Sequence, residues 1–144
     1  MRIKGWTAAV FASACLACGA PARAAETGTA SVVRPAFPEA QGWAATTPGG
    51  RGGKLLKVTT LDARGPGSLL EALETAGPRI VVFEVGGVID LGRETVKIRE
   101  PFLTIAGQTA PSPGVTLIRG GIDILTHDVI VRHIRVRPGA AGPA

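Results

Sequence analysis

The architecture of this chain can be read from three short aliphatic runs: Ile80-Val81-Val82-Phe83-Glu84-Val85, Leu103-Thr104-Ile105-Ala106 and Val129-Ile130-Val131-Arg132. Their first residues are separated by 23 and 26 positions, and two shorter β-favouring runs lie in each interval. A parallel β-helix requires three strands per turn at a period in the low to middle twenties, because each coil buries its inward residues against the coil before it. The spacing therefore favours a solenoid of stacked coils.

The other runs after position 80 are equally short and are separated by Gly, Pro, Asp or Thr. The predicted strands cover residues 80–85, 88–91, 96–98, 103–106, 115–118, 122–125, 129–132 and 134–137. None of the intervals holds a helical pattern long enough for the crossovers of a parallel α/β sheet, so the predicted class is all-β. A sandwich of hairpins remains the alternative, although the chain lacks Asn-Gly and Asp-Gly turn pairs.

One clear helix is predicted upstream of these strands, over residues 68–76. Ser68 can cap its N-terminus, Glu71 completes a capping box, and Gly77-Pro78 ends it. A helix of this length is not stable alone, so its apolar side must cover another part of the fold.

A glycine-rich segment at 42–54 invites comparison with a phosphate-binding loop. Gly49 and Gly53 enclose three residues rather than four, and Leu55 follows Lys54 where Ser or Thr is needed. We interpret the segment as a tight turn whose glycines supply positive φ beside closely packed backbone.

The first 24 residues have the organisation of a signal peptide. Arg2 and Lys4 precede an apolar stretch at 6–18 that is too short to span a bilayer, and Ala22-Arg23-Ala24 is a small-residue cleavage site. Residues 25–35 are predicted to form a mobile leader without periodicity. The sequence therefore predicts an exported protein, secreted or periplasmic, with no membrane anchor after cleavage.

The composition agrees with one packed domain stabilised by its core. The chain has 144 residues, of which 45% are hydrophobic and 19% charged, and both cysteines lie within the predicted signal peptide. Its formal charge of +5 comes from 16 basic and 11 acidic residues, and three of the basic residues leave with the signal peptide. The remaining charge of about +2 does not support nucleic-acid binding.

The last strands carry the candidate binding residues. Val129 and Val131 face one way, the phase slips at His133, and Ile134 and Val136 then face inward. His133 is interpreted as a corner residue rather than a catalyst. Three arginines point outward and could bind the carboxylates of an acidic polysaccharide, or form a solvated face; they are Arg132, Arg135 and Arg137. Two nearby acids are assigned to turn and surface roles, namely Asp123 and Asp128.

Several blocks, in this order, resemble the N-terminal part of pectate lyase-like secreted proteins. The most specific are Thr47-Pro48-Gly49-Gly50-Arg51-Gly52-Gly53-Lys54, Gly65-Pro66-Gly67-Ser68-Leu69-Leu70-Glu71-Ala72-Leu73 and Ile80-Val81-Val82-Phe83-Glu84-Val85-Gly86-Gly87-Val88-Ile89-Asp90-Leu91. Further matching blocks lie at 36–42, 58–61, 104–111 and 129–139. The resemblance covers residues 36–139 and implies a right-handed parallel β-helix whose N-terminal opening is covered by the predicted helix.

The resemblance also implies a chemistry. Pectate lyases cleave acidic, polygalacturonate-type polysaccharide by β-elimination, with a metal, usually calcium, on the uronate carboxylate and an arginine as the base. In that pattern the calcium ligands and the base belong to later coils, so we assign no catalytic and no metal-binding residue in this chain. Residues 140–144 are expected to be a tail.

The whole chain is therefore expected to be an incomplete and inactive N-terminal part of such an enzyme. The alternatives are a non-catalytic β-helix that binds acidic glycans and an adhesin-type solenoid. Because residues 80–139 supply little more than two coils, which is few for a solenoid, the inner residues Ile134 and Val136 are expected to be exposed and the chain to be unstable or to aggregate.

Overall fold

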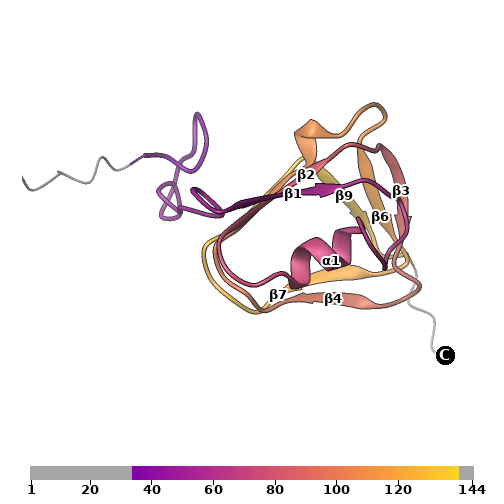
Figure 1. The fold of residues 1–144 in the computed structure, drawn as a ribbon. Coiled ribbons are helices and arrows are strands. Elements are labelled where there is room, and N and C mark those ends of the chain that lie inside the picture. Colours follow the sequence, from indigo (N-terminus) through magenta and orange to yellow (C-terminus); the bar gives the residue numbers. More distant parts are fainter. Residues whose placement is uncertain (1–33, 140–144) are drawn as a thin grey trace, which may run out of the picture. The chain divides into compact units, whose positions relative to one another are not determined.

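The structure is a computed structural model that describes residues 34–139, and in this part the chain winds around a common axis (Figure 1). The predicted signal peptide and tail, and nearly all of the leader, lie outside the described residues. The elements in chain order are β1 (Lys54–Val58), α1 (Leu69–Glu74), β2 (Arg79–Phe83), β3 (Gly87–Asp90), β4 (Thr95–Ile98), β5 (Leu103–Ala106), η1 (Gly107–Thr109), β6 (Val115–Ile118), β7 (Gly121–Ile124), β8 (Val129–Arg132) and β9 (Ile134–Arg137). No helix in this range is long and apolar enough to cross a membrane.

The strands form three sheets, and every pairing in them is parallel. The first sheet has the order β1-β2-β5-β8, the second β3-β6-β9 and the third β4-β7. From β2 onward, consecutive strands belong to different sheets, and each strand pairs with a strand of a neighbouring coil. This is the predicted parallel β-helix, and the all-parallel pairing excludes the sandwich of hairpins.

The register corrects the predicted period by one residue. Arg79 pairs with Leu103, 24 positions further on, and Leu103 pairs with Val129 after another 26. The predicted first strand of the series started at Ile80, one residue late: β2 begins at Arg79, a charged residue at an inward position of the strand. Arg79 is nevertheless fully buried.

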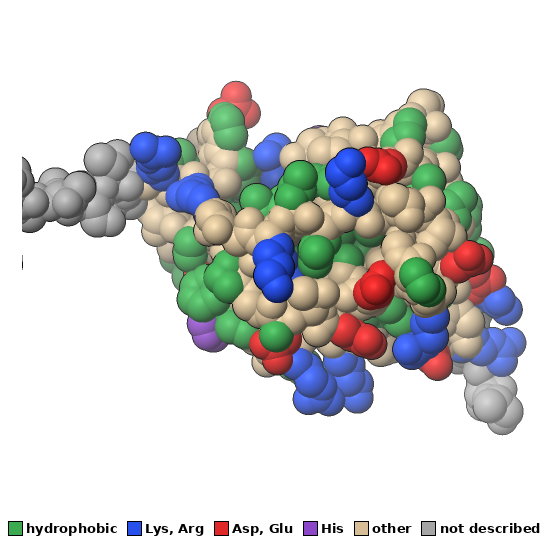
Figure 2. Space-filling model, viewed as in Figure 1, with side chains coloured by type: hydrophobic (Ala, Val, Ile, Leu, Met, Phe, Trp, Pro, Cys, Tyr) green, Lys and Arg blue, Asp and Glu red, His purple; other side chains and the backbone are tan. Residues whose placement is uncertain are grey.

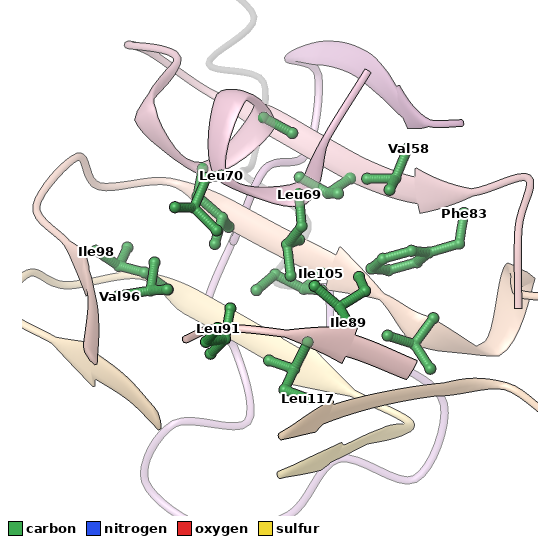
Figure 3. Packing of buried hydrophobic residues seen from close by; sticks show 14 of the residues in the cluster. Val58, Leu69, Leu70, Phe83, Ile89, Leu91, Val96, Ile98, Ile105 and Leu117 are labelled. Atoms are coloured by element: carbon green, nitrogen blue, oxygen red, sulfur yellow. The ribbon is translucent and has the colours of Figure 1, made fainter. Parts of the chain in front are cut away.

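The core lies in the lumen between the three sheets. Side chains from successive coils stack on one another there, and Leu69 and Leu70 of α1 point from the helix into the same cluster (Figure 3). Ile89 pairs in register with Leu117, and Leu117 with Val136. The side chains of Ile89 and Leu117 are both 0% exposed, whereas that of Val136 is 41% exposed. The expected exposure of Val136 is confirmed, whereas Ile134 is half-buried and packs against the core.

Helix α1 covers the lumen at the first coil, as predicted, and contacts β1, β2 and β4 (Figure 1). All four of its apolar side chains are buried: Leu69, Leu70, Ala72 and Leu73. Ser68 Oγ accepts a hydrogen bond from Glu71 N at 3.3 Å, and Glu71 Oε2 accepts one from Gly67 N at 2.6 Å. The carboxylate thus reaches one residue further back than in an ordinary capping box. The helix is shorter than the predicted 68–76, because Thr75 already has an extended backbone.

Arg79 joins the C-terminal end of α1 to the neighbouring turns. Its Nε donates to Ala72 O at 3.3 Å and its Nη2 to Leu73 O at 2.7 Å, while Nη1 donates to Gly77 O at 3.0 Å and Pro101 O at 3.1 Å. Burial lowers the pKa of Arg79, and the nearby Glu100 opposes this effect. A positive charge at the last helical carbonyls is favourable, because the helix dipole makes this end negative.

Residues 42–51 of the glycine-rich segment belong to a flap, which we define as residues 35–51, that packs on the outer face of the first sheet. Gly49 has φ +54°, and Gly50 N donates to Thr104 Oγ1 at 2.9 Å. A Cβ on Gly50 would overlap the carbonyl oxygen of Arg79. The segment is therefore the predicted tight turn beside packed backbone, and it also buries the outward side chain of Ile130.

Candidate functional site

The three predicted binding arginines lie on two different sheets. Arg132 ends β8 in the first sheet, and Arg135 and Arg137 lie on β9 in the second. His133, at φ +55°, forms the corner between these strands, as predicted. The alternation inferred from the sequence is correct, but the corner separates Arg132 from the other two, so the three do not form one continuous strip.

Arg132 packs against the flap. Its guanidinium carbon lies 4.4 Å from the centre of the Phe37 ring, which is a cation–π contact. The side chain is half-buried in consequence. The N–H groups of Arg132 that do not contact the ring can still donate hydrogen bonds, so Arg132 can hold the flap and bind an anion at the same time.

Arg135 and Arg137 occupy outward, exposed positions two residues apart. Arg135 Nη1 donates to Pro113 O at 2.8 Å, which orients its guanidinium. Neither arginine forms an ion pair with an acidic side chain of the described residues. Their charges are therefore not neutralised by a carboxylate within residues 34–139.

An ion pair that the sequence analysis missed lies on the same face. Asp90 pairs in register with Ile118, and Ile118 with Arg137. Arg119 Nε donates to both carboxylate oxygens of Asp90, at 2.8 and 2.9 Å, and Arg119 Nη2 donates to Asp90 as well. The hydrogen bonds from Arg119, and then the one from Gly92 N, lower the pKa of Asp90. Asp90 is thus paired with its own cation, and the separation of 29 positions is longer than the coil spacings read from the sequence, which therefore did not indicate the pair.

The predicted surface acids do not form a calcium site. Asp123 lies on β7 directly opposite Lys97 in register, and Asp128 Oδ2 lies 2.7 Å from His127 Nδ1 in a turn with φ +56°. Within residues 34–139 there is no group of three or more His, Cys, Asp or Glu side chains that could hold a metal ion. Calcium needs six to eight oxygen ligands, so these residues do not fit the ion that the resemblance implied.

A pocket of about 470 Å³ lies beside α1, at the other end of the coil stack from β8 and β9. Its lining includes Glu71 and Glu74, together with Arg64, whose Nη2 donates to Glu94 at 2.6 Å. Acidic and basic side chains are interspersed on the face seen in Figure 2. Because two carboxylates line the pocket and its arginine is paired, the pocket is poorly suited to a polyanion.

Comparisons with known proteins identify the class. No family model matches the chain. Over 108 residues, it is 45% identical to the "Probable pectate lyase C" of Aspergillus terreus, 46% to that of Emericella nidulans and 45% to that of Aspergillus fumigatus strain Af293. Each match covers 74% of this chain and 25% of the relative, so the chain spans about a quarter of the length of these curated relatives.

The stacked parallel coils and the covering helix define a parallel β-helix of the pectin-lyase type. The sequence identity shows which family within this fold the chain belongs to. It is a pectate lyase-like protein that matches the N-terminal portion of the relatives. The resemblance predicted from the sequence blocks is thereby confirmed.

Proposed function

We propose that this chain is the N-terminal part of an exported pectate lyase-like protein that, in its complete form, cleaves polygalacturonate-type polysaccharide by β-elimination. The observation that carries the proposal is the 45% identity, over 108 residues and 74% of this chain, to a protein named "Probable pectate lyase C". The described residues would contribute the covered first coil and a binding face on β9.

The chemistry of that face suits an acidic polymer. Arg135 and Arg137 are outward neighbours on one strand, so their side chains start about 6.7 Å apart along it. Each guanidinium can bind a uronate carboxylate through two parallel N–H groups. Because neither has a carboxylate partner within residues 34–139, binding the polymer breaks no existing ion pair.

We further propose that the chain by itself binds the polymer without cleaving it. The described residues include no group that could hold a calcium ion, and the curated relatives are about three times as long as this chain. Calcium dependence, export through the N-terminal segment and the complete enzyme's activity are parts of this proposal. The other function considered is a non-catalytic β-helix that binds acidic glycans.

Two measurements test the proposal. We expect polygalacturonate to bind the full chain in a titration calorimeter, and the double variant Arg135→Gln/Arg137→Gln to bind several-fold more weakly. The matched control is Arg93→Gln/Arg99→Gln. It removes the same charge from two exposed residues, one in the turn before β4 and one directly after β4. Equal affinity of the two double variants would contradict the assignment of β9.

The second measurement is the release of unsaturated uronide with calcium present and absent. We expect none from this chain and calcium-dependent release from a longer form that continues the β-helix. If the longer form binds polygalacturonate but releases no product, the non-catalytic glycan-binding function is the correct one.

A further inference from the structure

The flap presents a tryptophan entirely to solvent. The side chain of Trp43 is 99% exposed, the largest exposure among the large hydrophobic residues of the described range. It follows Gly42, which has φ +88°, in a turn closed by a hydrogen bond of 3.1 Å from Ala45 N to Gly42 O. An indole has one of the largest apolar surfaces of any side chain, and here almost none of it is buried by the fold.

The exposure of Trp43 does not come from a loosely attached loop. Ala36 N donates to Ala45 O at 2.7 Å, which closes the base of the flap's outer loop. Arg51 Nη2 donates to Pro35 O at 2.7 Å, and Phe37 lies under the guanidinium of Arg132. The turn that carries the indole is therefore attached to the β-helix on both sides.

The same contacts hold two guanidinium groups at the flap. Arg51 is exposed and donates from one of its terminal nitrogens to Pro35 O, and the guanidinium of Arg132 lies over the Phe37 ring. Neither forms an ion pair with an acidic side chain within residues 34–139. The flap thus combines an aromatic platform with two oriented cations that have N–H groups to donate.

We propose that the flap is an accessory binding surface for an acidic polysaccharide, on which one sugar ring stacks on Trp43 and neighbouring carboxylates pair with Arg51 and Arg132. The choice of this ligand rests on the proposed function. The C–H face of a sugar ring packs against the negative face of the indole, and the guanidinium groups recognise carboxylates. This surface is separate from the face that carries Arg135 and Arg137, because those residues lie on another sheet.

The fluorescence of Trp43 can be used to measure binding at the flap. The chain has two tryptophans, Trp6 and Trp43, so the full-length variant Trp6→Phe fluoresces from the flap alone. We expect polygalacturonate to shift this emission to shorter wavelength and to protect it from iodide, with saturation. Neutral galactan should produce little change, and high salt should weaken the effect of polygalacturonate. Titration calorimetry in parallel reports binding anywhere on the chain.

Variants separate the contributions. Arg51→Gln should weaken the emission change several-fold, whereas Arg99→Gln, which removes the same charge elsewhere, should leave it unaltered. Trp43→Ala should reduce the calorimetric affinity, and Leu55→Ala, at another exposed apolar residue of the same sheet, should not.

Three results would overturn the inference. Calorimetric binding without any change in Trp43 emission would leave the proposed function intact and remove the flap from it. No binding by either method would contradict both proposals. An emission shift that depends on protein concentration and not on polysaccharide would assign the flap to self-association instead.

Discussion

At the scale of single residues, Arg79 has the largest predicted effect on stability. Its guanidinium supplies hydrogen bonds to carbonyls from α1, from the turn after it and from the turn before β5. Arg79→Met would leave these buried carbonyls without donors, and we expect the free energy of unfolding to fall by about 3 kcal/mol or more. Urea denaturation followed by circular dichroism measures this loss.

Two further variants sharpen the test of Arg79. Arg79→Lys keeps the charge, but one ammonium cannot reach both the helix end and the turns, so an intermediate loss is expected. Arg99→Met, at an exposed position, should change the free energy of unfolding by no more than about 0.5 kcal/mol. An unfolding midpoint of Arg79→Met equal to that of the wild type would show that these hydrogen bonds do not stabilise the fold.

Asp90 is expected to make stability depend on pH. Arg119 and the Gly92 amide hold the pKa of Asp90 below its ordinary value of 3.8. A carboxyl whose pKa is lower in the folded state contributes stability that is complete above the unfolded pKa and is lost as the pH falls through the folded one. The wild type should therefore melt at a higher temperature than Asp90→Asn at pH 7, by the small margin of an exposed ion pair.

The difference between these melting temperatures should shrink as the solution becomes acidic and vanish below the lowered pKa. Asp123→Asn, at an exposed carboxylate of β7, serves as the charge-matched control. A gap between wild type and Asp90→Asn that stays constant across the acidic range would argue against the ion pair as its source.

At the scale of elements, the strands were predictable because each coil repeats one local pattern. Four predicted strands have the same bounds in the structure, and the others differ by one or two residues at their ends. The helix was predictable from Ser68 and Gly77, and the corner from the change of phase at His133. These features depend on neighbours within a few positions, which a single sequence displays.

Contacts between distant coils were not predictable in the same way. Ile130 occupies an outward position of its strand, yet the flap buries it through Gly49, which lies 81 positions upstream. The separation of Arg132 from Arg135 likewise depends on which sheet each strand joins. To predict these contacts, one would need to know which strands of successive coils pair and in which register. The local alternation of residues does not determine this.

The attachment of the flap depends on Gly50. A methyl group there would meet the carbonyl of Arg79, and the amide of Gly50 is bonded to Thr104. We expect Gly50→Ala to cost about 1–3 kcal/mol through overpacking and to make the Arg51 peptide bond more accessible to trypsin. Urea denaturation and limited proteolysis measure the two effects.

The matched control for Gly50→Ala is Gly121→Ala. Gly121 lies in β7, has no positive φ, and a Cβ on it would meet no atom within 4 Å. This variant should unfold and be digested like the wild type. Equal behaviour of Gly50→Ala and Gly121→Ala would contradict the close approach between the flap and the β-helix.

At the scale of the whole described part, the two ends of the coil stack differ. The first coil is covered by α1, whereas the strands at the other end, β7, β8 and β9, have no further strand beside them within residues 34–139. Inward side chains at that end are 40% exposed at Val131 and 49% at Ile124, compared with 1% at Ile105 and 0% at Ile98 one coil earlier. Unpaired strand edges beside exposed apolar residues are a template for association with another chain.

We therefore expect this chain to self-associate with rising concentration and to unfold at low denaturant, which sedimentation velocity and urea titration measure. Ile124→Lys/Val136→Lys should reduce association, because inward charges on edge strands oppose pairing. The control Val88→Lys changes a valine that is 51% exposed but points outward from β3, and it should associate like the wild type. A soluble monomer at all concentrations with one cooperative thermal transition would contradict the prediction, and would show that the first coils and their covering helix suffice for a stable fold.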